Sequence, residues 1–366
     1  MSGARGALPP HILHVYPQGR ARDVIGDAGN RLRHTLVTRD GTMPDGLRQT
    51  AYCKPASAFP ALGGLPTPGR MQRLARAMTP FDLVLTYGYD ALDVAMAHTI
   101  FRDKLDLPAL VHHEYAADDR PSMKRTWYRR VALGKAAGLV VPGETLEAAA
   151  LVDWQQPIGR VKRIAPGIDT KAFARRPKKD GFRLIKRDGE FWLGAWPQAK
   201  ADADLAMLLE AFAALPESWQ LVILGDDMRS DALDAAIARL ELEDRIYFPG
   251  EPRDPARVLG LFDLFFDGAA HGAFPAHVAQ VMAAGVPVVA PRQGEAGQMV
   301  AAENREWLTD GSSGTLGAHL RALAGDKAAR RTIGEANRAH AVRQYDLART
   351  MADYRRLYSS AMKREY

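Results

Sequence analysis

Two stretches of the sequence carry side chains that can take part in chemistry at the ends of predicted strands. The first is LVHHEY (110–115), in which His113 and Glu114 follow an apolar run. The second is HGAFPAHVAQVMAAGVPVVAP (271–291), which predicts a loop, a short helix ending at Gly285 and then a buried strand. Ligands of open parallel sheets bind beyond the C-terminal ends of the strands, so both stretches are candidates for a ligand site.

Four polar residues in and after the second stretch could face a ligand. His271 lies in the predicted loop, and His277 precedes Gln280 by about one helical turn. Arg292 directly follows the buried strand, at the end where ligand-binding residues belong. Each of these side chains could instead be a solvated or capping residue, and for His277 we favour that plain interpretation.

The elements that must position these residues are short apolar strands alternating with helices. This alternation predicts an α/β protein with parallel, doubly wound sheets. The predicted strands form two sets, at 11–16, 81–87, 108–113 and 137–143, and at 191–196, 219–227, 245–250, 264–269 and 286–291. Predicted helices include 69–78, 125–136, 203–215, 231–242 and 347–364. Two such sets predict two Rossmann-like domains with a ligand cleft between them.

A polar segment rich in Pro, Gly and Lys separates the two sets of strands and predicts a linker. We therefore expect an N-terminal acceptor-side domain over 1–165, a linker over 166–181 and a donor-side domain over 182–346. Residues 347–366 are expected to form a C-terminal crossover helix.

Composition and charge limit the classes of function. The 366 residues contain a single cysteine, no apolar run long enough to cross a bilayer and no recognisable signal peptide, so we expect a cytoplasmic protein. The net charge is +6, made up of +10 over residues 1–180 (27 basic, 17 acidic) and −4 over 181–366 (22 basic, 26 acidic). The basic half suggests an anionic partner. We expect no nucleic acid, because no nucleic-acid motif accompanies the charge.

Segments of the second half resemble, in order and spacing, the retaining glycosyltransferases of family four. VKRIAPGIDTKAF (161–173) resembles the interdomain passage of that family, and IGEANRAHAVRQYDLARTMADYRRLY (333–358) resembles its last helices. The segments between them that match are LLEAFAAL (208–215), LVILGDD (221–227), DRIYFPG (244–250) and VMAAGVPVVAP (281–291). The resemblance is strong over roughly the last two thirds of the chain and weaker before it.

This resemblance implies the GT-B fold, in which two Rossmann-like domains face each other across a cleft and the C-terminal helix returns to the first domain. It also implies a retaining transfer of a sugar, of the hexosyltransferase type, from a nucleotide-sugar donor to a glycan or lipid-linked acceptor. Neither a cofactor nor an obligatory metal is implied. Family members usually place an arginine and a lysine beside the leaving diphosphate, where negative charge develops.

Four polar groups that the family usually supplies are replaced in this sequence. The two glutamates that orient the sugar and the ribose fall at Gly272 and Gln280, while the arginine and the lysine fall at Ala195 and Ala203. Lys200 lies three residues earlier and could serve if the loop is remodelled. Loss of one such cation should raise the barrier by roughly 3 kcal/mol.

The resemblance gives His113 and Glu114 as catalytic residues, with His112 as the alternative if the register slips by one. Gly19, in the loop after the first strand, resembles the glycine that lets the backbone approach the donor phosphates. The residues expected to bind the donor are Gly19, Gly194, Lys200, Gly225, Phe248, His271, Gly272, Phe274, Gln280 and Arg292.

The segment SMKRTWYRRVALGK (122–135) combines basic residues with two aromatic residues. A basic helix of this kind fits attachment to an anionic membrane surface, which would place the protein peripherally on the inner face of a membrane. The alternative is a partly buried aromatic pair on an ordinary surface helix. The residues expected to contact a membrane or the acceptor are Lys124, Arg125, Trp127, Arg129 and Arg130.

Two functions of different class follow from these observations. The first is an active glycosyltransferase with a rebuilt donor site. The second is a catalytically silent homologue that acts as a binding or scaffolding subunit for a protein partner, because the replacements lie where the chemistry is done. A minor third hypothesis is an enzyme whose donor lacks the usual diphosphate.

Overall fold

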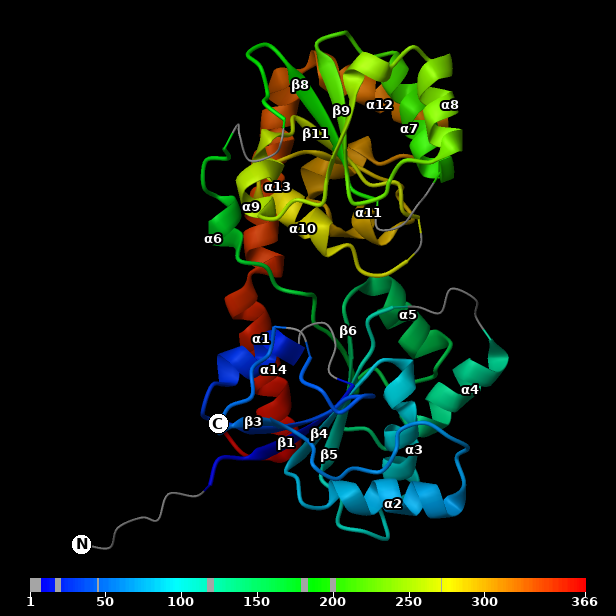
Figure 1. Ribbon diagram of the computed structural model, residues 1–366, viewed down its shortest axis with the longest axis vertical. Helices are drawn as coiled ribbons and strands as arrows, with labels where there is room; N and C mark the ends of the chain where they lie inside the picture. The colour runs from blue at the N-terminus through cyan, green and yellow to red at the C-terminus, as the bar shows by residue number, and fades with distance from the viewer. Residues whose placement is uncertain are drawn as a thin grey trace, which may run out of the picture. The chain divides into compact units, whose positions relative to one another are not determined.

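The computed structural model describes residues 8–16, 21–44, 46–116, 122–178, 184–197, 202–270 and 272–366. The chain divides into two compact units (Figure 1). The first consists of Met1–Pro166 with Ala348–Tyr366, and the second of Gly167–Leu347. Each unit is a parallel sheet with helices on its faces, and the C-terminal helix packs with the first unit, so the predicted α/β class is confirmed.

The first unit is built on a sheet of seven parallel strands. Their order is β3-β2-β1-β4-β5-β6-β7, so the chain runs outward from β1 to one edge and then returns to build the other side. This order is that of a doubly wound sheet. The strands are β1 (His11–Val15), β2 (Arg33–Val37), β3 (Cys53–Pro55), β4 (Leu83–Tyr87), β5 (Ala109–His113), β6 (Gly138–Val141) and β7 (Val161–Arg163).

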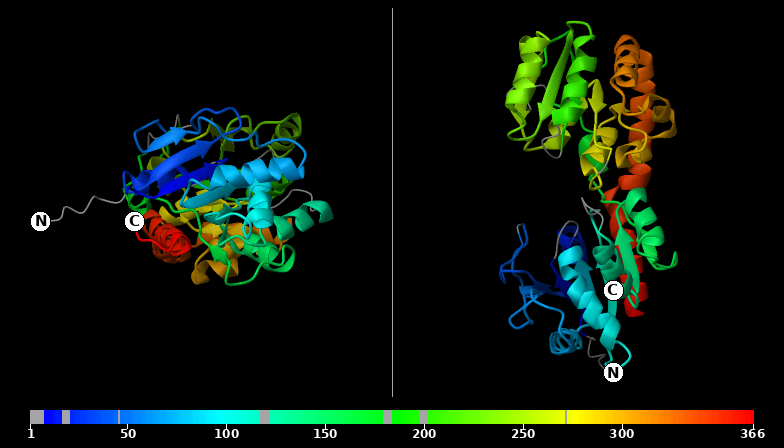
Figure 2. Two further views of the ribbon diagram at one scale, coloured as in Figure 1. Left: turned by 90° about the horizontal axis from the view of Figure 1, so that it is seen from below. Right: turned by 90° about the vertical axis from the view of Figure 1, so that its right-hand side faces the viewer.

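Helices cover both faces of this sheet, which explains why its central strands are buried on both sides. One face packs against α2, α3 and α5 through a core that includes Leu13, Val84, Leu110 and Leu139. The other face carries α14 (Figures 1 and 2). The helices of this unit are α1 (Ala21–Ala28), α2 (Pro68–Met78), α3 (Leu92–Phe101), α4 (Met123–Ala132), α5 (Glu144–Val152) and α14 (Leu347–Met362), with a 3-10 turn, η1 (Tyr89–Ala91).

The face covered by α14 contains a chain of buried polar side chains. His14 bonds through Nδ1 with the hydroxyl of Tyr87 (2.9 Å) and through Nε2 with Nδ1 of His34 (2.9 Å). The hydroxyl of Tyr358, on α14, lies 2.8 Å from Nε2 of His113. Burial lowers the pKa of His14 well below its usual value, that of His34 to about 4 and that of His113 to about 3. These imidazoles are therefore neutral in the folded chain at pH 7.

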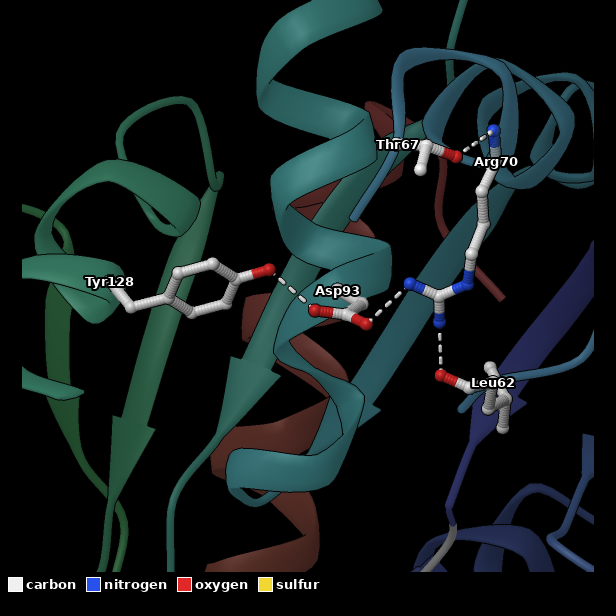
Figure 3. A network of polar contacts seen from close by, with 5 residues as sticks. All are labelled: Leu62, Thr67, Arg70, Asp93 and Tyr128. Atoms are coloured by element: carbon white, nitrogen blue, oxygen red, sulfur yellow. Dashed lines mark hydrogen bonds and ion pairs between the residues drawn. The ribbon is translucent and has the colours of Figure 1, made fainter. Parts of the chain in front are cut away.

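A network of polar contacts attaches α4 to α2 and α3 (Figure 3). Arg70 places Nη1 2.6 Å from Oδ2 of Asp93 and also donates to the carbonyl of Leu62, while the hydroxyl of Tyr128 donates to Oδ1 of Asp93. Thr67 accepts from the backbone N–H of Arg70 (3.4 Å) and caps α2. Burial and the bond to Asp93 raise the pKa of Tyr128. Tyr128 is thus held against α3.

The second unit is built on a sheet of five parallel strands in the order β10-β9-β8-β11-β12. Its first strand in sequence, β8, lies at the centre of the sheet. The C-terminal ends of β8, β9 and β11 therefore lie at one edge of this sheet. The strands are β8 (Phe191–Ala195), β9 (Trp219–Leu224), β10 (Ile246–Gly250), β11 (Leu264–Phe266) and β12 (Val288–Val289).

Helices α7, α8 and α12 pack on one face of the second sheet through Leu208, Phe212, Ile237 and Leu320, and α10 packs with α13 on the other (Figure 2). The α-helices of this unit are α6 (Thr170–Phe173), α7 (Asp202–Ala213), α8 (Asp231–Arg239), α9 (Pro255–Val258), α10 (Ala276–Ala283), α11 (Glu295–Met299), α12 (Ser313–Gly325) and α13 (Lys327–Tyr345). Its 3-10 helices are η2 (Glu243–Arg245), η3 (Leu259–Leu261) and η4 (Ala302–Trp307).

Part of the predicted linker is built into the second unit. Residues 167–178 contain α6, and the backbone N–H of Ile168 donates to the carbonyl of Tyr345 (2.7 Å). The carbonyl of Ile168 in turn accepts from Leu347 (2.9 Å). The described part of this segment is therefore attached to the second unit at the junction of α13 and α14, through the backbone of Ile168.

Candidate active site

Two adjoining cavities lie at the ends of parallel strands in the second unit. The larger has a volume of about 480 Å³ and is bounded by the residues after β8 and β11, the first turn of α7 and the starts of α10 and α11. The smaller, of about 310 Å³, is bounded by the ends of β8, β9 and β10 and by α10. Both are lined by Trp196, Pro197 and His277. Such a position at the strand ends is where open parallel sheets bind ligands.

A buried histidine hydrogen-bonded to an aspartate lies beside the cavities, the histidine lining both of them and the aspartate the larger one. His277, in the first turn of α10, places Nε2 2.7 Å from Oδ2 of Asp267, which directly follows β11. Both residues are 6% exposed. The second oxygen of Asp267 accepts from the backbone N–H of Ala269 (2.9 Å). The imidazole is therefore held in one orientation by a carboxylate that is itself fixed by its loop.

The larger cavity is acidic. Besides Asp267, it is lined by Asp204 and Glu295. Burial, together with the negative charge of Asp267, raises the pKa of Asp204. Asp204 and Asp267 therefore lie close enough for the charge of one to affect the pKa of the other. Gly268 leaves room for Asp204, because a Cβ at position 268 would lie 2.9 Å from the Cβ of Asp204.

The smaller cavity combines an aromatic side chain with acceptor oxygens. The indole N–H of Trp196 donates to Glu251 (3.2 Å), and the backbone N–H of Glu251 donates to Asp226 (3.0 Å). Gly225 turns the chain with a φ of +113°, in the region that favours glycine. The Oε1 atom of Gln280 is buried and has no hydrogen-bond partner within the described part of the chain. This cavity can therefore accept hydrogen bonds from hydroxyl or amino groups.

The structure brings together some of the residues predicted to bind the donor. Gly272 and Phe274 line the larger cavity, and Gly225 and Gln280 line the smaller one. Their role as donor contacts stays a prediction. Gly19, Lys200 and His271 lie outside the described residues.

Three other predicted donor residues do not line either cavity. Gly194 is buried in the sheet, and a Cβ at this position would lie 2.8 Å from the ring of Phe262, so the glycine is required for packing. Phe248 packs on the core, with the guanidinium of Arg229 5.4 Å from its ring centre. Arg292 is exposed, and its backbone N–H donates to the carbonyl of Thr309. None of the three therefore lines a cavity in this structure, and their role as donor contacts stays a prediction.

The predicted catalytic pair, His113 and Glu114, is buried and bonded within the first unit. His113 is 1% exposed, and the carbonyl of Thr86 and the hydroxyl of Tyr358 occupy its two ring nitrogens (3.3 and 2.8 Å). Glu114 is 4% exposed and lies 3.2 Å from Nε of Arg129. The strand end carries both residues, but their polar atoms bond within the first unit. These contacts indicate a structural role within the described part of the unit, and the catalytic role stays a prediction.

The basic helix α4 divides into a buried side and an exposed side. Arg129 is 1% exposed and its guanidinium lies 4.9 and 4.8 Å from the rings of Tyr89 and Trp154, so it cannot contact a membrane and that prediction is wrong. Arg125 lies over Tyr89 (4.0 Å), and Arg130 donates to the carbonyl of Asp153. Lys124 and Trp127 are exposed.

The comparison with known proteins identifies this architecture. Residues 182–340 match the family model of glycosyl transferases group 1. Among solved structures, the chain is similar to HepE of Anabaena in complex with UDP, with 19% identity, a TM-score of 0.75 and coverage of 96% of this chain and 100% of that one. The fold is GT-B. Curated protein sequences give no match to this chain.

Two further GT-B structures are similar over almost the whole chain. A glycosyltransferase from Rickettsia africae is 14% identical, with a TM-score of 0.73 and coverage of 97% of this chain and 99% of that one. Sucrose-phosphate synthase from Thermosynechococcus elongatus is 18% identical, with a TM-score of 0.70 and the same two coverages. Both cavities lie within the matched residues 182–340.

Sequence analysis missed the most fully positioned group of the site. His277 had been given a solvated or capping role, but it is buried and paired, and its partner Asp267 had not been singled out. One signal was present in the sequence, because Asp267 is a polar residue within the last half of the predicted strand 264–269, near the edge where ligands bind. Its pairing with a histidine ten residues later could not be predicted without the loop geometry.

Proposed function

We propose that this GT-B chain is a glycosyltransferase that takes a sugar from a nucleotide-sugar donor bound in the two cavities of the second unit. The observation that carries the proposal is the pair of adjoining cavities at the strand ends of the part that matches glycosyl transferases group 1. HepE, which has the same fold, has been crystallised with UDP and with UDP-glucose. The proposed reaction retains the anomeric configuration and uses a glycan or a lipid-linked sugar as acceptor.

The cavity walls suit a ligand that is rich in hydroxyl groups. Carboxylate and amide oxygens accept hydrogen bonds from hydroxyls, and Asp204, Asp267 and Gln280 offer such oxygens. Trp196 adds an apolar ring on which a sugar or a base can pack. In the proposed complex, Gln280 accepts from the ribose and the carboxylates of the larger cavity accept from the sugar.

Calorimetric titration with UDP, GDP, ADP and their common sugar conjugates tests the binding step. We expect one base to be preferred, and Gln280→Leu to weaken binding of that nucleotide about tenfold, since it removes one buried acceptor. Gln293→Leu, on an exposed residue outside both cavities, is the control and should bind as the wild type does. If no nucleotide and no conjugate binds the wild-type chain, the proposal is wrong.

Turnover tests the reaction itself. Incubation of the protein with the preferred donor should release the nucleoside diphosphate, and NMR of the transferred sugar should show the anomeric configuration of the donor. An inverted product would contradict retention alone. The proposed reaction needs no cofactor and no obligatory metal, so we expect the same rate with and without EDTA.

One observation favours a catalytically silent subunit as the second candidate. The described walls of the two cavities carry five carboxylates, Asp204, Asp226, Glu251, Asp267 and Glu295, and neither a lysine nor an arginine. Such walls oppose the accumulation of negative charge on a leaving diphosphate. This candidate predicts a stable protein partner and no release of nucleoside diphosphate from any donor, so turnover by the isolated chain excludes it.

Attachment to an anionic membrane is proposed for the exposed side of α4. Met123 is 91% exposed and Trp127 62% exposed, and Lys124 lies beside them. An aromatic and a flexible apolar side chain next to a cation can insert at the level of lipid headgroups. Among the described residues, no helix is long and apolar enough to span a bilayer. This attachment would hold the chain peripherally on the cytoplasmic face.

Flotation with vesicles tests this attachment. We expect the protein to float with vesicles of phosphatidylglycerol and to stay behind with phosphatidylcholine. Trp127→Ser should reduce flotation, whereas Val152→Ser, at an exposed apolar residue of α5, should not. Equal recovery with both lipids would contradict the proposal.

A further inference from the structure

His277 differs from the other ionisable side chains on the described walls of the two cavities. It lines both cavities, and it is the one ionisable side chain there that can carry a positive charge. The other ionisable groups on these walls are carboxylates. Those of the larger cavity are Asp267 after β11, Asp204 on α7 and Glu295 on α11. Those of the smaller cavity are Asp226 and Glu251. Within the described walls, a bound anion can therefore be held only by this side chain, by uncharged donors and by backbone amides.

The position of His277 in the chain adds to this effect. It is the second residue of α10, a helix whose first backbone N–H groups have no partner within the helix. The start of a helix carries a partial positive charge, and anions bind there. The imidazole and the first turn of α10 therefore lie together on the shared wall.

The bond to Asp267 leaves one ring nitrogen for a ligand. Nε2 is held at 2.7 Å from the carboxylate, and Nδ1 makes no hydrogen bond with any described residue. A protonated ring in this place is paired with Asp267, so its charge is not an uncompensated buried charge. In that form, Nδ1 is a donor, and hydrogen bonds between charged donors and phosphate oxygens are short and strong.

We propose that His277, oriented by Asp267, donates a hydrogen bond from Nδ1 to the diphosphate of the bound nucleotide. His277 is then a ligand-contacting residue, and Asp267 is a positioning residue that holds the protonated ring in place. The inference rests on the proposed function, because it assigns a contact within the proposed donor site. It requires binding of the diphosphate to depend on protonation of the ring.

The experiment is a calorimetric titration of the full chain with UDP, and in parallel with GDP and ADP, at about pH 6 and about pH 8. The phosphates of the nucleotide also titrate near pH 6. The measured quantity is therefore the ratio of wild-type to variant affinity at each pH, because the titration of the nucleotide affects both proteins equally and cancels in this ratio. We expect His277→Gln to bind the preferred nucleotide about tenfold more weakly at the lower pH and nearly as well at the higher pH. His319→Gln, on α12 and outside both cavities, is the matched control and should leave the ratio near one.

Asp267→Asn provides a second variant. Its amide oxygen can still accept from Nε2, so the ring keeps its orientation, but the charge that compensates the imidazolium is removed. We therefore expect Asp267→Asn to bind the preferred nucleotide more weakly than the wild type does at about pH 6. If His277→Gln does not fold, the wild-type profile compared with Asp267→Asn still decides the question.

The outcomes separate the two levels of the argument. If the wild-type chain binds none of the three nucleotides, the proposed function fails and the inference with it. If it binds one of them, but with the same affinity ratio to His277→Gln at both pH values, the inference is overturned and the proposed function stands. Loss of affinity in Lys200→Gln, with His277→Gln unchanged, would assign the charge to Lys200 and would likewise overturn it.

Discussion

The hydroxyl of Tyr358, near the end of the chain, lies 2.8 Å from Nε2 of His113, at the end of the fifth strand. Both residues are 1% exposed. The contact joins the C-terminal helix α14 to the sheet of the first unit, across 245 positions of sequence. It indicates a structural role for a histidine that resembles a catalytic residue.

Removing this hydroxyl should destabilise the first unit. Tyr358→Phe leaves Nε2 of His113 buried without its donor, at a cost of about 1–2 kcal/mol in the free energy of unfolding. Urea denaturation near neutral pH measures the change. Tyr52→Phe, at a residue that is 41% exposed, is the control and should unfold as the wild type does. If the two variants unfold alike, the contact does not stabilise the fold.

Acidification should destabilise the first unit through its buried histidines. Burial lowers the pKa of His34 and of His98 to about 4 and that of His113 to about 3. An unfolded chain takes up these protons near pH 6.5, so it binds more protons than the folded chain below that pH. The stabilising effect of the neutral rings is therefore complete above about pH 6.5 and falls as the pH drops toward 4.

Between about pH 6.5 and pH 4, each such histidine lowers the free energy of unfolding by up to about 1.4 kcal/mol for every unit by which the pH falls. Urea midpoints between about pH 7.5 and 5 measure the slope, above the range in which most carboxylates titrate. His34→Gln should make the slope shallower, whereas His319→Gln, in the second unit, should not change the unfolding of the first. A midpoint that stays constant across this range would contradict the account.

The comparison of sequence and structure separates local patterns from long-range contacts. Apolar runs such as 83–87 and 264–266 predicted strands because burial on both faces of a parallel sheet requires continuous apolar sequence. The strand β2 was missed because RHTLV mixes polar and apolar residues, and β3 because it has only three residues. Alternation of strands and helices was therefore sufficient for the fold class but not for every strand.

The site was predictable only as a location. The strand ends at 195 and 266 and the short helix 276–283 were all identifiable from the sequence, and they do bound the larger cavity. The partners of individual polar side chains could not be identified from the sequence. Glu114 and Arg129, like Asp267 and His277, lie on different elements, so no helical or strand periodicity relates the two members of a pair. Such pairs depend on how loops fold back, which a local pattern does not encode.

The pair of Glu114 and Arg129 should be structural. Both side chains are buried, with Nε of Arg129 3.2 Å from Oε2 of Glu114. Glu114→Gln keeps the shape but removes the carboxylate charge from its buried contact with the guanidinium, so we expect a loss of about 1.5–3 kcal/mol in the free energy of unfolding. Glu144→Gln, in the exposed pair with Arg163, should cost about 1 kcal/mol or less.

Urea denaturation combined with a turnover assay distinguishes this role from catalysis. If Glu114→Gln unfolds like the wild type but transfers no sugar, Glu114 has the catalytic role that the resemblance implied. If it is destabilised and its folded fraction binds nucleotide normally, the structural role holds.

Gly194 provides the last test, because the resemblance gave it a donor contact and the structure gives it a packing role. A Cβ at this position would lie 2.8 Å from the ring of Phe262 and 2.9 Å from that of Phe265. Both rings are buried, so neither can move aside without disturbing the sheet. Gly194→Ala should therefore destabilise the second unit by about 1–3 kcal/mol.

The control for this prediction is Gly314→Ala, on α12, where no atom lies within 4 Å of the added Cβ. Alanine is favoured over glycine within helices, so this variant should be as stable as the wild type or slightly more so. If Gly194→Ala instead keeps the stability of the wild type and loses affinity for nucleotide, the glycine is a donor contact. If Gly194→Ala is less stable and its folded fraction binds nucleotide with unchanged affinity, the role of Gly194 is packing. The close approach of β8 to the two rings then explains why this position has no side chain.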